Sequence, residues 1–186
     1  MKIESLALPD VKLIRPARHA DARGFLSEMW RRDAFLEAGI DLDFVQDNHS
    51  FSRAKGTLRG LHFQSPPFAQ AKLVIVAAGA VFDVAVDLRQ QSPTFGRSVT
   101  AVLSRENAHE MLIPEGFAHG FCTLEADTQV IYKLTAPYAP DHDKGVHWRD
   151  PALAIDWPVR EGDAVLSDRD RALPLLADLP PYFVDR

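Results

Sequence analysis

The residues with the clearest chemical potential are grouped in one short stretch, Arg59-Gly60-Leu61-His62-Phe63-Gln64. Histidine changes charge near neutral pH and can accept a proton from carbon or oxygen. Arginine presents a fixed fork of donors that suits a phosphate or a carboxylate. A histidine between a leucine and a phenylalanine is, on its own, more often a hydrogen-bonded core or edge residue than a catalyst. The stretch therefore indicates proton transfer only in combination with other segments of the chain.

A second chemical motif is Pro114-Glu115-Gly116-Phe117-Ala118-His119. It resembles the P-x-G-x-x-H half of the signature of cupin jelly rolls, in which a turn delivers a histidine to the barrel interior. Metal-binding cupins also carry an H-x-H pair with a following glutamate, and His62 has no second imidazole beside it. Because a catalytic metal usually takes at least three protein ligands, the sequence favours a metal-free site. The alternative is a metal held by His62, His119 and a distant His49 or Glu28.

The composition indicates an ordinary globular protein, and we expect one domain over residues 1–186, of which 46% are hydrophobic. The net charge of −5 argues against nonspecific nucleic-acid binding, so an anionic ligand requires a local cluster of arginines and lysines. The single cysteine, Cys122, excludes an intrachain disulfide, and its apolar neighbours favour a small buried residue. Without a signal pattern at Met1 or an apolar run of about 18 residues, we expect a cytoplasmic protein.

The elements that must position these residues are short strands. Alternation is clearest over 81–88, where the even-numbered residues are apolar and the odd-numbered ones include Asp83 and Asp87. One short helix is expected over 34–38, with Asp33 as its N-cap and Gly39 as its end. The last fifty residues are rich in proline and predict an irregular segment with a short helical stretch near 168–176. Further strands are predicted at 11–15, 25–30, 44–52, 57–64, 70–76, 98–103, 110–113, 116–123 and 129–135.

Strands that recur about every 8–12 residues, without long crossover helices, predict an all-β sandwich or barrel, and the cupin motif makes it a jelly roll. Segment 44–52 is polar for an interior strand and predicts either a strand facing a wet cavity or a solvated edge strand. Strict alternation sends Arg59 and His62 to opposite faces, so a regular strand would not present both to one ligand. A bulge or twist at Gly60 would re-aim one of them. No Gly-x-Gly-x-x-Gly or Walker-type loop offers a seat for a nicotinamide cofactor or ATP.

Six collinear segments, which span nearly the whole chain, together resemble the dTDP-4-dehydrorhamnose 3,5-epimerase family. They are residues 59–64, 71–74, 82–89, 92–96, 113–121 and 156–158. The resemblance implies a jelly-roll homodimer that inverts C3 and C5 of a dTDP-4-keto-6-deoxy-hexose on the route to dTDP-L-rhamnose, without metal or cofactor. The chemistry is consistent, because a C4 ketone acidifies the hydrogens on both adjacent carbons. Such an enzyme needs a base, an acid and donors that stabilise an enolate.

The resemblance also implies roles for individual residues. His62 would be the base, oriented by Asp170, while Tyr132 would be the acid and Lys72 would lie against the developing enolate oxygen. Without the resemblance, Tyr132 reads as an ordinary cross-strand aromatic and Lys72 as a solvated strand lysine. Tyr138 would stack on thymine. The full set of residues placed around the substrate is Arg23, Phe25, Glu28, Gln46, Asn48, Arg59, His119, Tyr138, Asp143 and, near the diphosphate, Arg169.

Four positions depart from the common pattern of the family. Phe68 stands where a histidine is frequent, and Asp143 stands where a glutamate is frequent. Ile75 and Ala78 replace frequent arginines, which fits either a changed nucleotide or altered surface packing. The family further implies that Phe25 and Glu28 reach the site from the neighbouring subunit through an exchanged amino-terminal strand.

Three other functions stay open at this level. An epimerase that acts on only one carbon of a related nucleotide sugar would share every motif. A metal-dependent cupin, such as an isomerase or dioxygenase, would differ in its metal content. A nonenzymatic cupin that binds sugar nucleotides would keep Arg59 and Tyr138, but it would not need a His62–Asp170 pair together with Tyr132.

Overall fold

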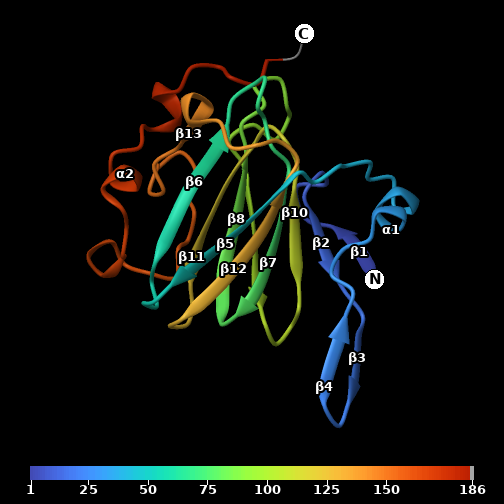
Figure 1. The fold of residues 1–186 in the computed structure, drawn as a ribbon. Helices are drawn as coiled ribbons and strands as arrows, with labels where there is room; N and C mark the ends of the chain where they lie inside the picture. Colours follow the sequence, from blue (N-terminus) through green and yellow to red (C-terminus); the bar gives the residue numbers. More distant parts are fainter. Residues whose placement is uncertain (185–186) are drawn as a thin grey trace.

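Two antiparallel β-sheets pack face to face in the computed structural model, which describes residues 1–184 (Figure 1). The six-stranded sheet has the order β1–β2–β10–β7–β12–β5. Its strands are Lys2–Ser5, Lys12–Arg15, Glu110–Ile113, Lys72–Ala78, Thr128–Leu134 and Gln46–Ser52, in that order. The five-stranded sheet, β13–β6–β11–β8–β9, consists of Asp143–Gly145, Leu58–Gln64, Phe117–Thr123, Ala80–Asp87 and Ser98–Ser104. The predicted all-β jelly-roll sandwich is confirmed.

Strand β8 shows why the alternating pattern folds this way. Its Val81 and Ala85 enter the core between the two sheets, while Val84 and Val86 pack on the outer face of the five-stranded sheet. Both faces are therefore buried, and apolar burial stabilises both at about 25 cal/mol per Å². Cys122 on β11 is buried as expected, and burial raises the pKa of its thiol to about 11.

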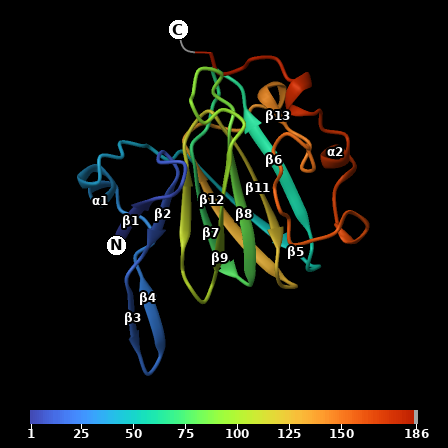
Figure 2. The same ribbon diagram turned by 180° about the vertical axis from the view of Figure 1, so that it is seen from behind.

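Separate segments cover the two outer faces. Helix α1, Arg32–Glu37, places Phe35 against the outer face of the six-stranded sheet. The carboxyl-terminal segment crosses the outer face of the five-stranded sheet, as both views show (Figures 1 and 2). This segment contains helix α2, Asp168–Arg171, and the 3₁₀ turns Pro140–His142, Glu161–Asp163 and Leu176–Asp178. Among residues 1–184, no helix is long and apolar enough to cross a membrane.

Several predicted boundaries need correction. The N-cap of α1 is Arg31, and Asp33 lies inside the first turn, where its carboxylate pairs with the Arg31 guanidinium at 2.6 Å. The helix ends before Gly39 as predicted, and this glycine has a φ of +76° that favours glycine. The helical stretch near 168–176 is shorter than expected, because α2 ends at Arg171. Strands β1, β3 and β13 were not predicted.

Strand β6 contains a bulge. His62 pairs with His119, but Arg59 pairs with Phe121, so β6 has one more residue than β11 between these positions. Gly60 has a φ of +125°, and a Cβ there would lie 2.5 Å from the Cα of the neighbouring strand's glycine. The predicted bulge at Gly60 is confirmed.

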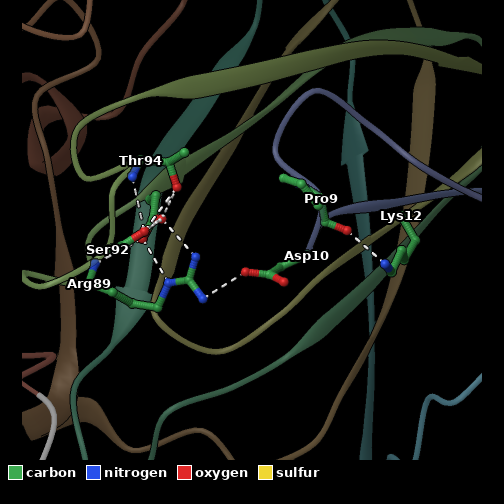
Figure 3. Close-up of polar contacts among 7 residues, drawn as sticks. Pro9, Asp10, Lys12, Arg89, Ser92 and Thr94 are labelled. Atoms are coloured by element: carbon green, nitrogen blue, oxygen red, sulfur yellow. Dashed lines mark hydrogen bonds and ion pairs between the residues drawn. The ribbon is translucent and has the colours of Figure 1, made fainter.

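At one end of the sandwich a buried carboxylate joins three segments. Asp87 is fully buried and accepts hydrogen bonds from Arg89 and from the hydroxyls of Ser92 and Thr94. Figure 3 shows Arg89 reaching from this group to Asp10, with which it pairs at 2.8 Å. Burial acts to raise the pKa of Asp87, but the hydrogen bonds outweigh it and hold the pKa at about 2. The network fixes the amino-terminal turn to the loop after β8.

The hairpin of β3, Arg18–Asp21, and β4, Gly24–Ser27, projects away from the two sheets (Figure 1). It exposes Phe25 and Leu26, the latter to 74%. At its base lies a mostly apolar cavity of about 170 Å³, which includes Glu110 in its lining. Glu110 is 2% exposed, and its Oε2 has no partner within residues 1–184. Burial raises the pKa of this carboxyl to about 8.

Candidate active site

A cavity of about 480 Å³ lies between the inner faces of the two sheets. One wall comes from Lys72 and Tyr132 of the six-stranded sheet, and the other from strands β6 and β11. The carboxyl-terminal segment closes a third side with α2 and the residues before it. The complete lining is Thr57, Leu58, Arg59, His62, Lys72, His119, Phe121, Tyr132, Val165, Leu166, Ser167, Arg169 and Asp170.

His62 and Asp170 meet at the edge of this cavity. Nε2 of His62 lies 2.7 Å from Oδ1 of Asp170, and the His62 side chain is 28% exposed. Ser167 caps α2 by accepting a hydrogen bond from the backbone N–H of Asp170, which places the carboxyl group. Burial acts to raise the pKa of Asp170, but hydrogen bonds from His62, the Gly60 N–H and Ser167 hold it below its usual value. Asp170 is therefore an ionised partner for the imidazole.

Lys72 and Tyr132 stand on neighbouring strands of the opposite wall. The Lys72 ammonium donates to the backbone carbonyl of His62 at 3.1 Å. Its side chain is buried, so the reading of Lys72 as a solvated strand lysine is wrong. Burial lowers the pKa of Lys72 to about 8, although the carboxylates of Asp143 and Asp83 act in the opposite direction. Tyr132 is half-buried against the inter-sheet core and reaches the same cavity.

A polar rim adjoins the cavity at Asp143. The Arg169 guanidinium pairs with the Asp143 carboxylate at 2.7 Å, and the Tyr138 hydroxyl donates to the same carboxylate at 3.0 Å. The shorter aspartate thus makes two contacts at this position. Burial acts to raise the pKa of Asp143, but Arg169 and Tyr138 hold it below its usual value.

Strand β5 carries the polar residues that were predicted to face either a cavity or solvent. It is the edge strand of its sheet, and its residues alternate between half-buried and exposed positions. Gln46 accepts from the Tyr138 backbone N–H at 2.8 Å and donates to Asn48 at 2.9 Å. The Arg59 guanidinium donates to the Ser52 hydroxyl at 3.2 Å. Both readings hold in part, because the inward residues border the site while the outward ones meet solvent.

Three predicted binding residues do not reach this cavity within one chain. Arg23 pairs with Asp21 at 2.6 Å in the projecting hairpin. Phe25 is 50% exposed, and the Arg18 guanidinium lies over its ring. Glu28 is exposed as well and faces Arg31 at 3.3 Å.

The residues of the alternative metal site do not form one group of metal ligands within the described residues. His49 lies on the exposed side of β5 and contacts Gln129 at 3.0 Å. His62 and His119 each have a carboxylate of their own at 2.7 Å. Within residues 1–184, no three His, Cys, Asp or Glu side chains are grouped as metal ligands.

The partner of His119 is Asp83, a site residue that the sequence reasoning missed. Asp83 is fully buried on the inward face of β8, and its Oδ2 has no partner among the described residues. Burial raises the pKa of this carboxyl, although His119 and Lys72 act against the increase. Two acids, Asp83 and Asp87, within a strand that is otherwise apolar were the available signal.

The other family departures lie outside the cavity lining. Phe68 is on a loop, with its ring 4.8 Å from that of His142. Ile75 is buried on the outer face of the six-stranded sheet, and Ala78 ends β7. Where the family frequently has an arginine, this chain therefore has an isoleucine that packs on that outer face.

Known proteins match the chain along nearly its whole length. The family described as dTDP-4-dehydrorhamnose 3,5-epimerase matches residues 5–178. The protein of that name from Sinorhizobium fredii is 51% identical over 183 residues, covering 98% of this chain and 93% of the relative.

Solved structures agree with the sequence matches. The dTDP-4-dehydrorhamnose 3,5-epimerase from Bacillus anthracis, solved with TDP and PPi bound, is 48% identical with a TM-score of 0.91, covering 94% of this chain and 98% of its own. The dTDP-6-deoxy-D-glucose-3,5-epimerase from Legionella pneumophila, in complex with dTDP-4-keto-L-rhamnose, is 46% identical with a TM-score of 0.94, covering 100% and 97%. With the fold and the whole length in agreement, the chain belongs to the dTDP-4-dehydrorhamnose 3,5-epimerase family.

Proposed function

We propose that this protein inverts C3 and C5 of dTDP-4-dehydro-6-deoxy-D-glucose and yields dTDP-4-dehydro-L-rhamnose, an isomerisation in dTDP-L-rhamnose biosynthesis. Membership of the epimerase family supports the reaction. The observation that supports the mechanism is the cavity itself, which has a His62–Asp170 pair on one side and Lys72 and Tyr132 on the other. These four residues form the proposed catalytic set.

The first chemical step is removal of a proton next to the C4 ketone. Nε2 of His62 is held by Asp170, so Nδ1 is the nitrogen that remains for the substrate. The ionised Asp170 fixes the ring and stabilises the imidazolium that forms. Lys72, charged below about pH 8, supplies a cation for the enolate oxygen from a buried position.

Inversion then requires a proton from the opposite face of the same carbon. One imidazole fixed on a strand reaches only one face, whereas Tyr132 projects from the opposite sheet. A tyrosine hydroxyl carries its proton at neutral pH and can donate it. The route consists of proton transfers alone and calls for no metal or redox cofactor.

The nucleotide would occupy the rim of the cavity. Tyr138 offers an exposed ring for stacking on thymine, and Arg169 and Arg59 offer guanidinium groups for the diphosphate. Arg169 would exchange its pairing with Asp143 for a phosphate oxygen. Gln46 and Asn48 border the same rim through Tyr138.

The enzyme would act as a cytoplasmic homodimer. The projecting hairpin and the following turn carry Arg23, Phe25 and Glu28, which lie outside their own cavity and would complete that of a second copy. Light scattering at micromolar concentration should give about twice the chain mass of 20.7 kDa. A single-chain mass under those conditions would contradict this assembly.

The activity is tested by proton NMR of dTDP-4-keto-6-deoxy-glucose incubated with the protein in heavy water. Deuterium should enter at both C3 and C5 as the L-sugar forms. Incorporation at one carbon alone would indicate a single-centre epimerase, and no incorporation would contradict the proposal. His62→Ala should abolish exchange at both carbons while dTDP still binds. His49→Ala, which removes an exposed histidine from the far side of β5, is the matched control and should exchange normally.

A further inference from the structure

Two histidines stand side by side in the cavity, each with its own carboxylate. His62 on β6 and His119 on β11 are direct partners in the strand register. Nε2 of each ring lies 2.7 Å from an aspartate oxygen, that of Asp170 for His62 and that of Asp83 for His119. Identical residues in equivalent pairs can still differ in function if their carboxylates differ in environment.

The two carboxylates do differ. Asp170 receives further hydrogen bonds from the Gly60 N–H and from Ser167, which favour its ionised form. Asp83 is fully buried, its Oδ1 faces only His119, and its Oδ2 has no partner within residues 1–184. An ionised carboxylate with a buried oxygen that lacks a donor is costly. The Asp83–His119 pair therefore carries one proton more than the Asp170–His62 pair.

The retained proton determines what the His119 ring presents to the cavity. If protonated Asp83 donates to Nε2, a neutral ring must carry its hydrogen on Nδ1. If the proton moves across to Nε2, the ring is an imidazolium and Nδ1 again carries hydrogen. Nδ1 has no protein partner among the described residues, and it is not fully buried. His119 lines the cavity, so this N–H is available to a ligand.

We propose that Asp83 is a positioning residue that holds His119 as a hydrogen-bond donor, through Nδ1–H, to an oxygen at the sugar end of the substrate. The inference rests on the proposed function and deepens it. His62 alone keeps an unprotonated nitrogen for proton removal. His119 adds a second hydrogen-bond donor to Lys72, from the opposite wall of the cavity. The sugar end is the one concerned, because His119 is in register with His62.

The protonation of His119 can be read directly from ¹⁵N spectra of the histidine-labelled protein at pH 7. His119→Gln identifies the signals of that ring by their loss. Nδ1 of His119 should show the shift of a protonated nitrogen, and Asp83→Ala should return the ring to a mixture of both tautomers. An unprotonated Nδ1 in the wild-type protein would overturn the proposal. This readout does not depend on turnover, so it stays separate from any failure of the epimerase assay.

Kinetics of three variants test the functional consequence. Asp83→Asn supplies an amide N–H to Nε2 and should keep kcat within about tenfold, while Asp83→Ala should lose up to the roughly 10²–10³-fold expected for one oriented donor, with KM little changed. Asp87→Asn is the matched control, a fully buried acid on the same face of β8 outside the cavity, and should keep kcat. If Asp83→Asn and Asp83→Ala lost activity equally, the negative charge of Asp83 would matter instead, and the proposal would be wrong.

Discussion

Replacing Lys72 by methionine should stabilise the protein and remove most of its activity. Burial lowers the pKa of Lys72 from 10.5 to about 8, a difference equivalent to about 3 kcal/mol against the charged form. Methionine has similar length and no charge, so the folded state should gain up to about 3 kcal/mol at pH 7, less the lost hydrogen bond to the His62 carbonyl. The loss of a cation beside the enolate should lower kcat by roughly 10²–10³-fold.

The same pKa predicts that stability and activity change in opposite directions as the pH rises. Lys72 is charged in the folded and unfolded states below about pH 8, and between about 8 and 10.5 only the unfolded chain keeps the proton. Stability should therefore rise with pH through that window. The activity that depends on the ammonium should fall there, so kcat/KM of the wild type should decline above about pH 8.

Urea unfolding of Lys72→Met at pH 7 and the pH profile of kcat/KM measure the two effects. Lys72→Arg should keep its charge and move the alkaline decline to higher pH. Lys133→Met is the matched control, because Lys133 lies on the other face of the six-stranded sheet and pairs with Asp47. Activity of Lys72→Met within tenfold of the wild type would refute the enolate role. An unchanged alkaline decline in Lys72→Met would assign that decline to another group.

Three further predictions concern other groups. Tyr132→Phe should still wash deuterium into the substrate through His62, while formation of the inverted sugar falls by roughly 10²–10⁴-fold, as NMR in heavy water can show; equal loss of both would mean that Tyr132 only positions the substrate. The pKa of Asp87 is about 2 in the folded chain and 3.8 when unfolded, a difference that contributes about 2 kcal/mol to the free energy of unfolding. This contribution should be lost as the pH falls from about 5 towards 2, and the urea midpoints of Asp87→Asn should lack this dependence. Glu110 holds its proton up to about pH 8 in the folded chain but only to 4.5 when unfolded, so stability should fall by about 3 kcal/mol between pH 4.5 and 7, and Glu110→Gln should abolish that slope in urea titrations.

Much of the β-sandwich followed from local patterns. The alternation of 81–88 and the turn residues around the other strands located most of both sheets, because successive side chains of a strand point to opposite faces. Strand β3 has no such pattern in Arg18–Asp21, and β13 has three residues that pair with the edge of β6. Each forms because it pairs with a partner strand, β4 for β3 and β6 for β13. The local pattern of residues in β3 and β13 does not encode that pairing.

The site divides in the same way. The bulge at Gly60 was expected because strict alternation sends Arg59 and His62 to opposite faces, whereas the family resemblance places both at one ligand. The His62–Asp170 contact joins residues 108 apart and was reached only through the family resemblance. Asp83 was placed on the correct face of its strand, but both faces of β8 are buried, so periodicity could not tell which one borders the cavity.

The bulge in β6 has a consequence for variation of this sequence. Gly60 and Gly120 face each other on the neighbouring strands β6 and β11. A Cβ on Gly60 would lie 2.5 Å from the Cα of Gly120. A Cβ on Gly120 would in turn lie 2.8 Å from the Arg59 carbonyl oxygen. Each glycine collides with backbone if it acquires a side chain, so no second substitution at a side chain can relieve the first. Mutant libraries that aim at new sugar nucleotides should leave this pair fixed and vary the rim around Tyr138 and Asp143, where the contacts are between side chains.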